Sequence, residues 1–274
     1  LVLISFLQSS QGISVDGLFN FQDFPIAFGN TVITCTADLS SHVPLYDIAS
    51  CFVDIRLLSV SEASGLIPFE PSLSLSGKIN NYGLTLDNII YNDLVSLLDG
   101  SGNLMWSFSD SIFESASLNL SLTSTTTSES YLVSASLSNP DKKTLSSLVN
   151  DFYFSSQISI NEFPMARVRL MQSELDVCSA DIMIMGTIEN PYVSLNVKPS
   201  RLSFSGVPFY FNAGASLDDG VFYLNDSQIL FGNHKVSNIS GQFSLSNFVG
   251  KVNAVYDGSL SSEYNIHAPI ELAI

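Results

Sequence analysis

Apolar and polar residues alternate along most of this chain. In the stretch 260–274, Ile266 and Ile270 occupy one parity, and Asn265 and Glu271 the other. Successive side chains of a β-strand point to opposite faces of a sheet, so this pattern predicts a strand with one apolar and one polar side. The same period of two recurs at 73–79, 104–108, 116–122, 131–137 and 193–197.

The pattern contains no long segment with the 3.6-residue period of an amphipathic helix. Two short stretches, 92–98 and 142–149, are compatible with either a helix or an irregular loop. Turn dipeptides punctuate the alternating runs, and some of them fit bends within a sheet. They are Asn80-Asn81, Asp99-Gly100, Asn139-Pro140, Asn190-Pro191, Asp219-Gly220, Gly232-Asn233 and Asp257-Gly258.

The sequence therefore predicts an all-β fold. We expect a long, curved, repetitive sheet whose apolar side lines an open groove, and the alternative is a β-sandwich whose apolar faces meet. The polar residues between the lining positions, such as Ser74, Asn119 and Ser194, should face solvent. The expected lining residues are Leu73, Leu75, Leu118, Leu120, Val193, Leu195, Phe204, Phe211, Tyr264, Ile266 and Ile270.

A short segment occurs twice. Phe21–Ala27 (FQDFPIA) and Ile160–Ala166 (INEFPMA) match in character at every position, at an offset of 139 residues from 21 to 160. Proline cannot donate to a sheet, so a repeated edge or bend is expected at both places. We interpret 1–274 as one continuous β segment of a longer protein, with an expected repeat of 1–139 and 140–274. The chain begins without Met and without a signal-peptide pattern.

The composition narrows the classes of function. Hydrophobic residues make up 46% and charged residues 13%, yet no run of about 18 apolar residues would span a bilayer. The net charge of −16 and the scattered ten Lys and Arg exclude a typical nucleic-acid partner and disfavour an anionic membrane surface. Cys35 and Cys51 would pair only if strands bring them together; buried thiols are the favoured interpretation.

Catalytic and metal-binding motifs are not found. The chain has no nucleophile elbow, P-loop, dinucleotide fingerprint or zinc motif, and His42, His234 and His267 have no metal-ligand spacing. Three Asn-x-Ser sequences occur, as expected by chance in a serine-rich chain. The sequence thus predicts a non-enzymatic protein without a cofactor.

The segment 180–245 carries the most specific pattern. Gly186-Thr187 is followed by Pro191, then by short strands, and later by the motif Ile239-Ser-Gly-Gln-Phe243. This succession resembles the TamB family of the AsmA-like group, the large subunit of the translocation and assembly module. The stretch 78–106 and the two Phe-Pro elements are similar to further parts of that pattern.

The resemblance implies a half-pipe sheet with an apolar inner face, similar to bridge-like lipid transfer proteins. It implies that phospholipid acyl chains pass between inner and outer membranes through the periplasm. A membrane anchor and an outer-membrane barrel partner of the TamA-like family would lie outside this segment. The alternatives are a role in outer-membrane protein assembly and a non-catalytic adhesin or binding module.

Overall fold

The structure is a computed structural model. It describes residues 1–9, 12–28, 31–45, 47, 50–62, 71–109, 112–140, 152–167, 176–187, 189–204, 206–246, 249–261 and 264–273. The described part is almost entirely strand, and its strands are assigned to one 17-stranded antiparallel sheet. The all-β prediction is confirmed. The chain divides into two compact units, Leu1–Ser130 and Tyr131–Ile274.

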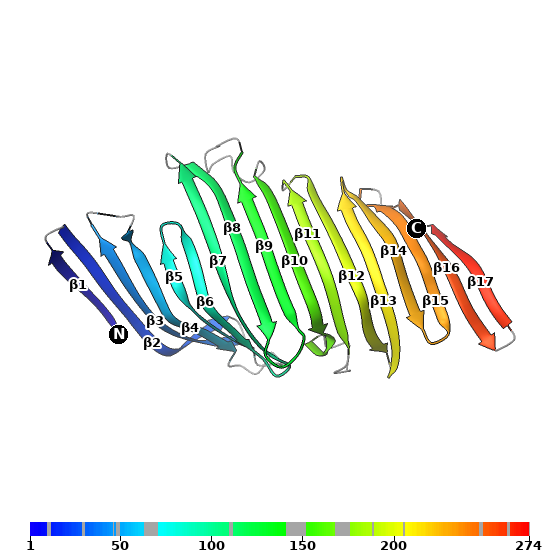
Figure 1. The fold of residues 1–274 in the computed structure, drawn as a ribbon, viewed down its shortest axis with the longest axis horizontal. Helices are drawn as coiled ribbons and strands as arrows, with labels where there is room; N and C mark the ends of the chain where they lie inside the picture. Colours follow the sequence, from blue (N-terminus) through cyan, green and yellow to red (C-terminus); the bar gives the residue numbers. More distant parts are fainter. Residues whose placement is uncertain are drawn as a thin grey trace. The chain divides into compact units, whose positions relative to one another are not determined.

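The first unit is a meander in which each strand pairs with the next one in the sequence (Figure 1). Alternating side chains and short polar turns account for this order. Its strands are β1 (Val2–Ser9), β2 (Gly12–Phe28), β3 (Thr31–Pro44), β4 (Phe52–Glu62), β5 (Ser72–Asn80), β6 (Gly83–Asn92), β7 (Leu97–Ser109) and β8 (Ile112–Ser124).

The second unit is also a meander, and its strands β10 to β17 pair in sequence order. β9 (Ser130–Ser138) pairs with β10. The remaining strands are β10 (Tyr153–Pro164), β11 (Val177–Gly186), β12 (Pro191–Phe204), β13 (Val207–Asp218), β14 (Val221–Phe231), β15 (His234–Ser244), β16 (Val249–Ser261) and β17 (Tyr264–Ala273).

Each unit is a single layer. Extensive contacts between the described strands of a unit join sequence neighbours alone, so no second sheet packs on the first. The sandwich alternative is not what the structure shows. Among the described residues few apolar side chains are buried; Ala37, Ile55 and Ile89 are examples in the first unit and Leu202 in the second. A single layer leaves its apolar face without a protein partner.

The stretch 92–98 is not a helix. The Asp93 carboxylate accepts hydrogen bonds from the backbone N–H groups of Val95 (2.9 Å) and Ser96 (2.8 Å) and thereby closes a tight turn between β6 and β7. The stretch 142–149 lies outside the described residues. A 3-10 turn, η3 (Met165–Arg167), follows β10. Among the described residues, no helix has the length and apolarity needed to cross a membrane.

Turn signals were only partly reliable. Asp219 and Gly220 both have positive φ (46° and 70°), as a type I′ hairpin turn requires, and they join β13 to β14. By contrast, Asp99-Gly100 and Asp257-Gly258 lie inside β7 and β16. Cys35 and Cys51 do not pair; Cys35 is buried and Cys51 half-buried.

Candidate functional site

The apolar side of the first unit is continuous across its eight strands. The pairing registers place apolar residues and glycines of successive strands opposite one another in rows that cross the sheet. We refer to these rows as the first apolar face. One row is Val2, Phe19, Leu39, Ile55, Gly77, Leu86, Gly102 and Leu120, and the next is Phe21, Ala37, Leu58, Leu75, Ile89, Gly100 and Leu122.

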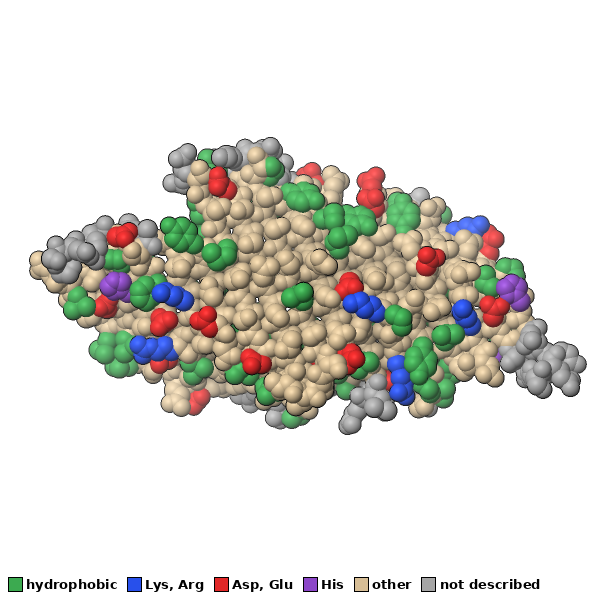
Figure 2. Space-filling view, viewed as in Figure 1, with side chains coloured by type: hydrophobic (Ala, Val, Ile, Leu, Met, Phe, Trp, Pro, Cys, Tyr) green, Lys and Arg blue, Asp and Glu red, His purple; other side chains and the backbone are tan. Residues whose placement is uncertain are grey.

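The opposite side of the first unit is polar. Its facing side chains bond to each other, as between Ser74 and Ser59 (Oγ–Oγ 3.2 Å) and between Asn119 Nδ2 and Asn103 Oδ1 (3.3 Å). Figure 2 shows one face of the molecule, on which charged side chains are scattered and hydrophobic ones form separate small groups. Such a face needs no covering layer, because its polar groups are solvated or paired.

The second unit repeats the arrangement. Its second apolar face contains the row Ile158, Ile182, Leu195, Ala215, Leu224, Gly241, Val252 and Leu272. Neighbouring rows add Val193, Leu217, Phe222 and Phe243, and Phe211, Ile229, Val236, Tyr256 and Ala268. The other side of this sheet is polar. On that side Ser194 of β12 and Ser216 of β13 stand opposite each other.

Nine of the eleven expected lining residues lie in rows of these two faces. Leu73, Leu75, Leu118 and Leu120 belong to rows of the first apolar face, and Val193, Leu195, Phe211, Ile266 and Ile270 to rows of the second. Phe204 and Tyr264 lie in β12 and β17, but their side chains are outside the described part. Ile270 remains 44% exposed, which agrees with an uncovered face rather than a closed core.

β-bulges interrupt the ladders near the middle of many strands. The ladder of β2 with β3 shifts register between Phe21 and Phe24, and that of β10 with β11 between Ile160 and Phe163. These are the two copies of the sequence repeat, and the bulge residues Asp23 and Glu162 have the same φ of 49°. Because a bulge bends its strand and increases twist, the predicted bend is present at both places.

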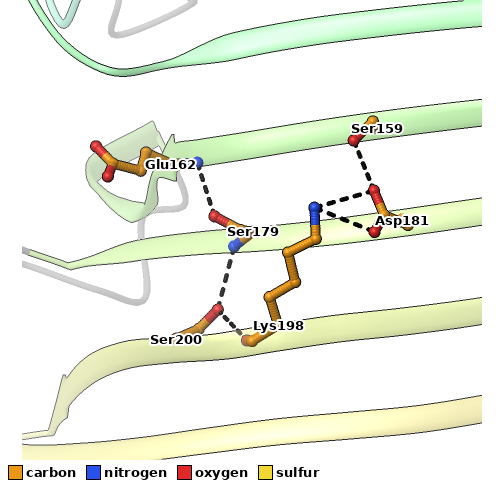
Figure 3. A network of polar contacts seen from close by, with 6 residues as sticks. All are labelled: Ser159, Glu162, Ser179, Asp181, Lys198 and Ser200. Atoms are coloured by element: carbon orange, nitrogen blue, oxygen red, sulfur yellow. Dashed lines mark hydrogen bonds and ion pairs between the residues drawn. The ribbon is translucent and has the colours of Figure 1, made fainter.

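Hydroxyl groups hold the bulges together. The backbone N–H of Asp23 donates to Thr36 Oγ1 (3.1 Å), and that of Glu162 donates to Ser179 Oγ (2.9 Å). Figure 3 shows how the second contact continues: the Ser179 N–H donates to Ser200 Oγ (3.1 Å), which itself donates to the Lys198 carbonyl (2.8 Å). Serine hydroxyl groups therefore link the bulge of β10 to β11, and β11 to β12.

The same contacts satisfy hydroxyl groups within the apolar face. Ser200 stands opposite Phe211 and is only 3% exposed. Ser227 stands opposite Ile239, accepts from the Gly214 N–H (3.2 Å) and donates to the Asn225 carbonyl (3.3 Å). Because backbone groups use both hydroxyls, these serines do not leave an unsatisfied polar atom on the face.

A charged network lies on the polar face beside the bulges. Asp181 accepts a hydrogen bond from Ser159 Oγ (2.6 Å) and forms an ion pair with Lys198 Nζ (3.1 Å) (Figure 3). The Ser159 hydrogen bond and the Lys198 charge hold the pKa of Asp181 below its ordinary value. The network ties β10, β11 and β12 together without entering the apolar face.

Hollows lie over the described residues of β1–β4. A hollow of about 220 Å³ is lined by Val2, Phe19 and Leu39 of the first apolar face. A larger one, of about 730 Å³, is lined by residues that include Leu18, His42 and Phe52. In the larger hollow His42 Nδ1 lies 2.6 Å from the Asp16 carboxylate, so these two polar side chains of the lining pair with each other.

Sequence reasoning missed a polar pair on the second apolar face. His234 Nδ1 and Tyr256 Oη are 2.6 Å apart, and the rings stack at 6.0 Å. The signal was available in the parity of the pattern, because His234 has the same parity as Val236, and Tyr256 the same as Ala254. No group of side chains that could hold a metal ion occurs among the described residues.

Comparison with known proteins finds no matching family model, no matching curated protein and no matching solved structure. The two apolar faces are the feature of the described residues that bears most on function.

Proposed function

We propose that the two apolar faces bind the acyl chains of phospholipids and carry them along the sheet. The observation that supports this most is the uncovered row of apolar residues across β1–β8. Each methylene that leaves water on such a face contributes about 0.8 kcal/mol. A non-directional force of this kind requires a continuous lining but no specific residue.

The dimensions of the face suit an acyl chain. Eight strands at a spacing of about 4.8 Å give a row of roughly 34 Å. One acyl chain covers about half of the ~30 Å hydrocarbon core of a bilayer. A single-layer sheet also leaves the lipid headgroup free to remain in water while the tail contacts the apolar face.

The setting of this activity follows from the resemblance to the TamB family. We propose that the chain is a segment of a periplasmic, non-enzymatic protein that moves phospholipid between inner and outer membranes. The inner-membrane anchor and the barrel partner that the resemblance implies remain predictions about parts outside this segment.

Paired substitutions on adjacent residues test the proposal. Leu195→Asp and Leu120→Asp place a carboxylate on an apolar face, whereas Ser194→Asp and Asn119→Asp place the same group on the polar side of the same strands. Native mass spectrometry of the purified chain should show co-purifying phospholipid in the wild type and in the polar-face variants, and its loss in the apolar-face variants. Equal lipid content in all five proteins, or none in the wild type, would contradict the proposal.

A further inference from the structure

The second apolar face contains one polar pair at its rim. His234 is the first residue of β15, directly after the Gly232-Asn233 turn, and it stands in the row of Phe231 and Ile266. Tyr256 stands in the adjacent row with Ile229 and Val236. The pair thus lies where an apolar face meets water, among side chains suited to an acyl chain.

Gly258 makes room for this pair. It is the register partner of His234, and a Cβ at this position would lie 2.3 Å from Tyr256 Oη and 2.6 Å from His234 Nδ1. Any other residue at 258 would displace the two rings. The absence of a side chain here is therefore a requirement of the His234–Tyr256 contact.

The His234–Tyr256 contact leaves one hydrogen-bond donor of the pair unused. A neutral imidazole carries one N–H and a phenol one O–H, and the 2.6 Å contact uses only one of these two protons. If the Tyr256 hydroxyl donates to Nδ1, the Nε2–H group of His234 remains. If Nδ1–H donates, the hydroxyl proton of Tyr256 remains. In both tautomers water can accept from this donor on the uncovered face, and an acyl tail that displaced the water would leave the donor in need of another acceptor.

We propose that His234 and Tyr256 bind the anionic oxygen of an amphipathic lipid headgroup, a carboxylate or a phosphate. This inference rests on the proposed function and adds a headgroup site to it. A charged acceptor is the strongest partner for the remaining donor, and the rim position lets the rest of the headgroup stay in water. The tail would then lie along Phe231, Ile229 and Val236.

Three ligands with the same sixteen-carbon tail separate headgroup from tail: palmitate, palmitoyl lysophosphatidate and hexadecanol. Their affinities for the complete 274-residue chain are measured by displacement of an apolar fluorophore. Loss of one hydrogen bond to a charged group should weaken binding about tenfold. We expect this loss for at least one anionic ligand in His234→Phe and in Tyr256→Phe, and no change for hexadecanol. The anion that loses affinity identifies carboxylate or phosphate as the source.

His267→Gln is the matched control, because His267 lies on the polar face and pairs with Asp257. It should leave all three affinities unchanged, and hexadecanol binding serves as the folding control for every variant. The headgroup site is refuted if hexadecanol binds but both anionic ligands bind the variants as tightly as they bind the wild type. If none of the three ligands binds the wild type, the proposed function itself fails.

Discussion

Single residues of the polar face stabilise the sheet through charge as well as through hydroxyl groups. Asp181 is the clearest case, because its carboxylate joins three strands through Ser159 and Lys198. Its side chain is 35% exposed, so solvent screens the ion pair and its contribution to stability stays modest.

The lowered pKa of Asp181 predicts a direction for the pH dependence. The folded state holds this carboxylate ionised at a lower pH than the unfolded chain does, so the stabilisation is complete above the ordinary value of 3.8 and is lost as pH falls below it. Asp181→Asn should lower the free energy of unfolding by up to about 1 kcal/mol at neutral pH. In urea titrations the difference in the free energy of unfolding between this variant and the wild type should shrink as the pH falls below 3.8.

A double-mutant cycle provides the control for this prediction. In the Ser159→Ala background, Asp181→Asn should cost less than in the wild type, since one of its partners is already missing. A cost that is independent of both pH and Ser159 would mean that the carboxylate acts through another contact.

At the scale of the strand, the bulges decide how each ribbon bends. Glu162 at φ 49° occupies a region that favours glycine and that β-branched residues avoid. Glu162→Gly should keep or raise stability by roughly 0.5 kcal/mol, whereas Glu162→Val should lower it by about 1–3 kcal/mol. Thermal unfolding followed by circular dichroism measures both changes.

The control for the bulge lies two residues earlier in the same strand. Ile160 is the last residue in register before the bulge and stands opposite Ala180, and Ile160→Val should cost about 1 kcal/mol through lost packing. If Glu162→Val costs no more than this, the positive φ at Glu162 does not constrain the choice of residue.

The sequence predicted the strands and their two faces, because a period of two leaves little freedom. It did not locate most bulges, since one inserted residue changes the register without changing composition. The two Phe-Pro copies were the exception. The Asp93 side chain accepts hydrogen bonds from backbone N–H groups and so forms a turn. The sequence around this turn has the spacing of a short helix, so the two could not be told apart. Gly100 looked like a turn residue, but it is needed because a Cβ there would lie 1.9 Å from the Ser121 carbonyl oxygen.

The polar pair escaped prediction for a different reason. Strand parity placed His234 on the apolar side, but only the register of β15 with β16 brings it beside Tyr256. Register is a property of two strands together, and no single run of residues encodes it.

At the scale of the whole molecule, each single-layer unit has edge strands whose backbone N–H and C=O groups are open to pairing with another molecule. In the described part of the first unit β1 pairs with β2 and with no other strand, and Val2–Ser9 contains no charged residue and no proline. β17 is different, because Pro269 lacks an N–H to donate and Glu271 adds a charge. Uncharged, apolar edge strands are the usual sites of strand pairing between molecules.

We therefore expect the purified chain to associate in a concentration-dependent way through β1. Leu7 is 52% exposed on the side of the sheet opposite to Ile4 and Phe6, so Leu7→Lys adds a charge to the edge and leaves the first apolar face intact. This variant should raise the dissociation constant for self-association at least tenfold in sedimentation velocity. Leu45→Lys removes a leucine of similar exposure (58%) that lies outside the strands and should have no such effect. A wild type that stays monomeric at every concentration would contradict the prediction. An equal reduction of association by both variants would mean that general hydrophobicity, rather than the β1 edge, drives association.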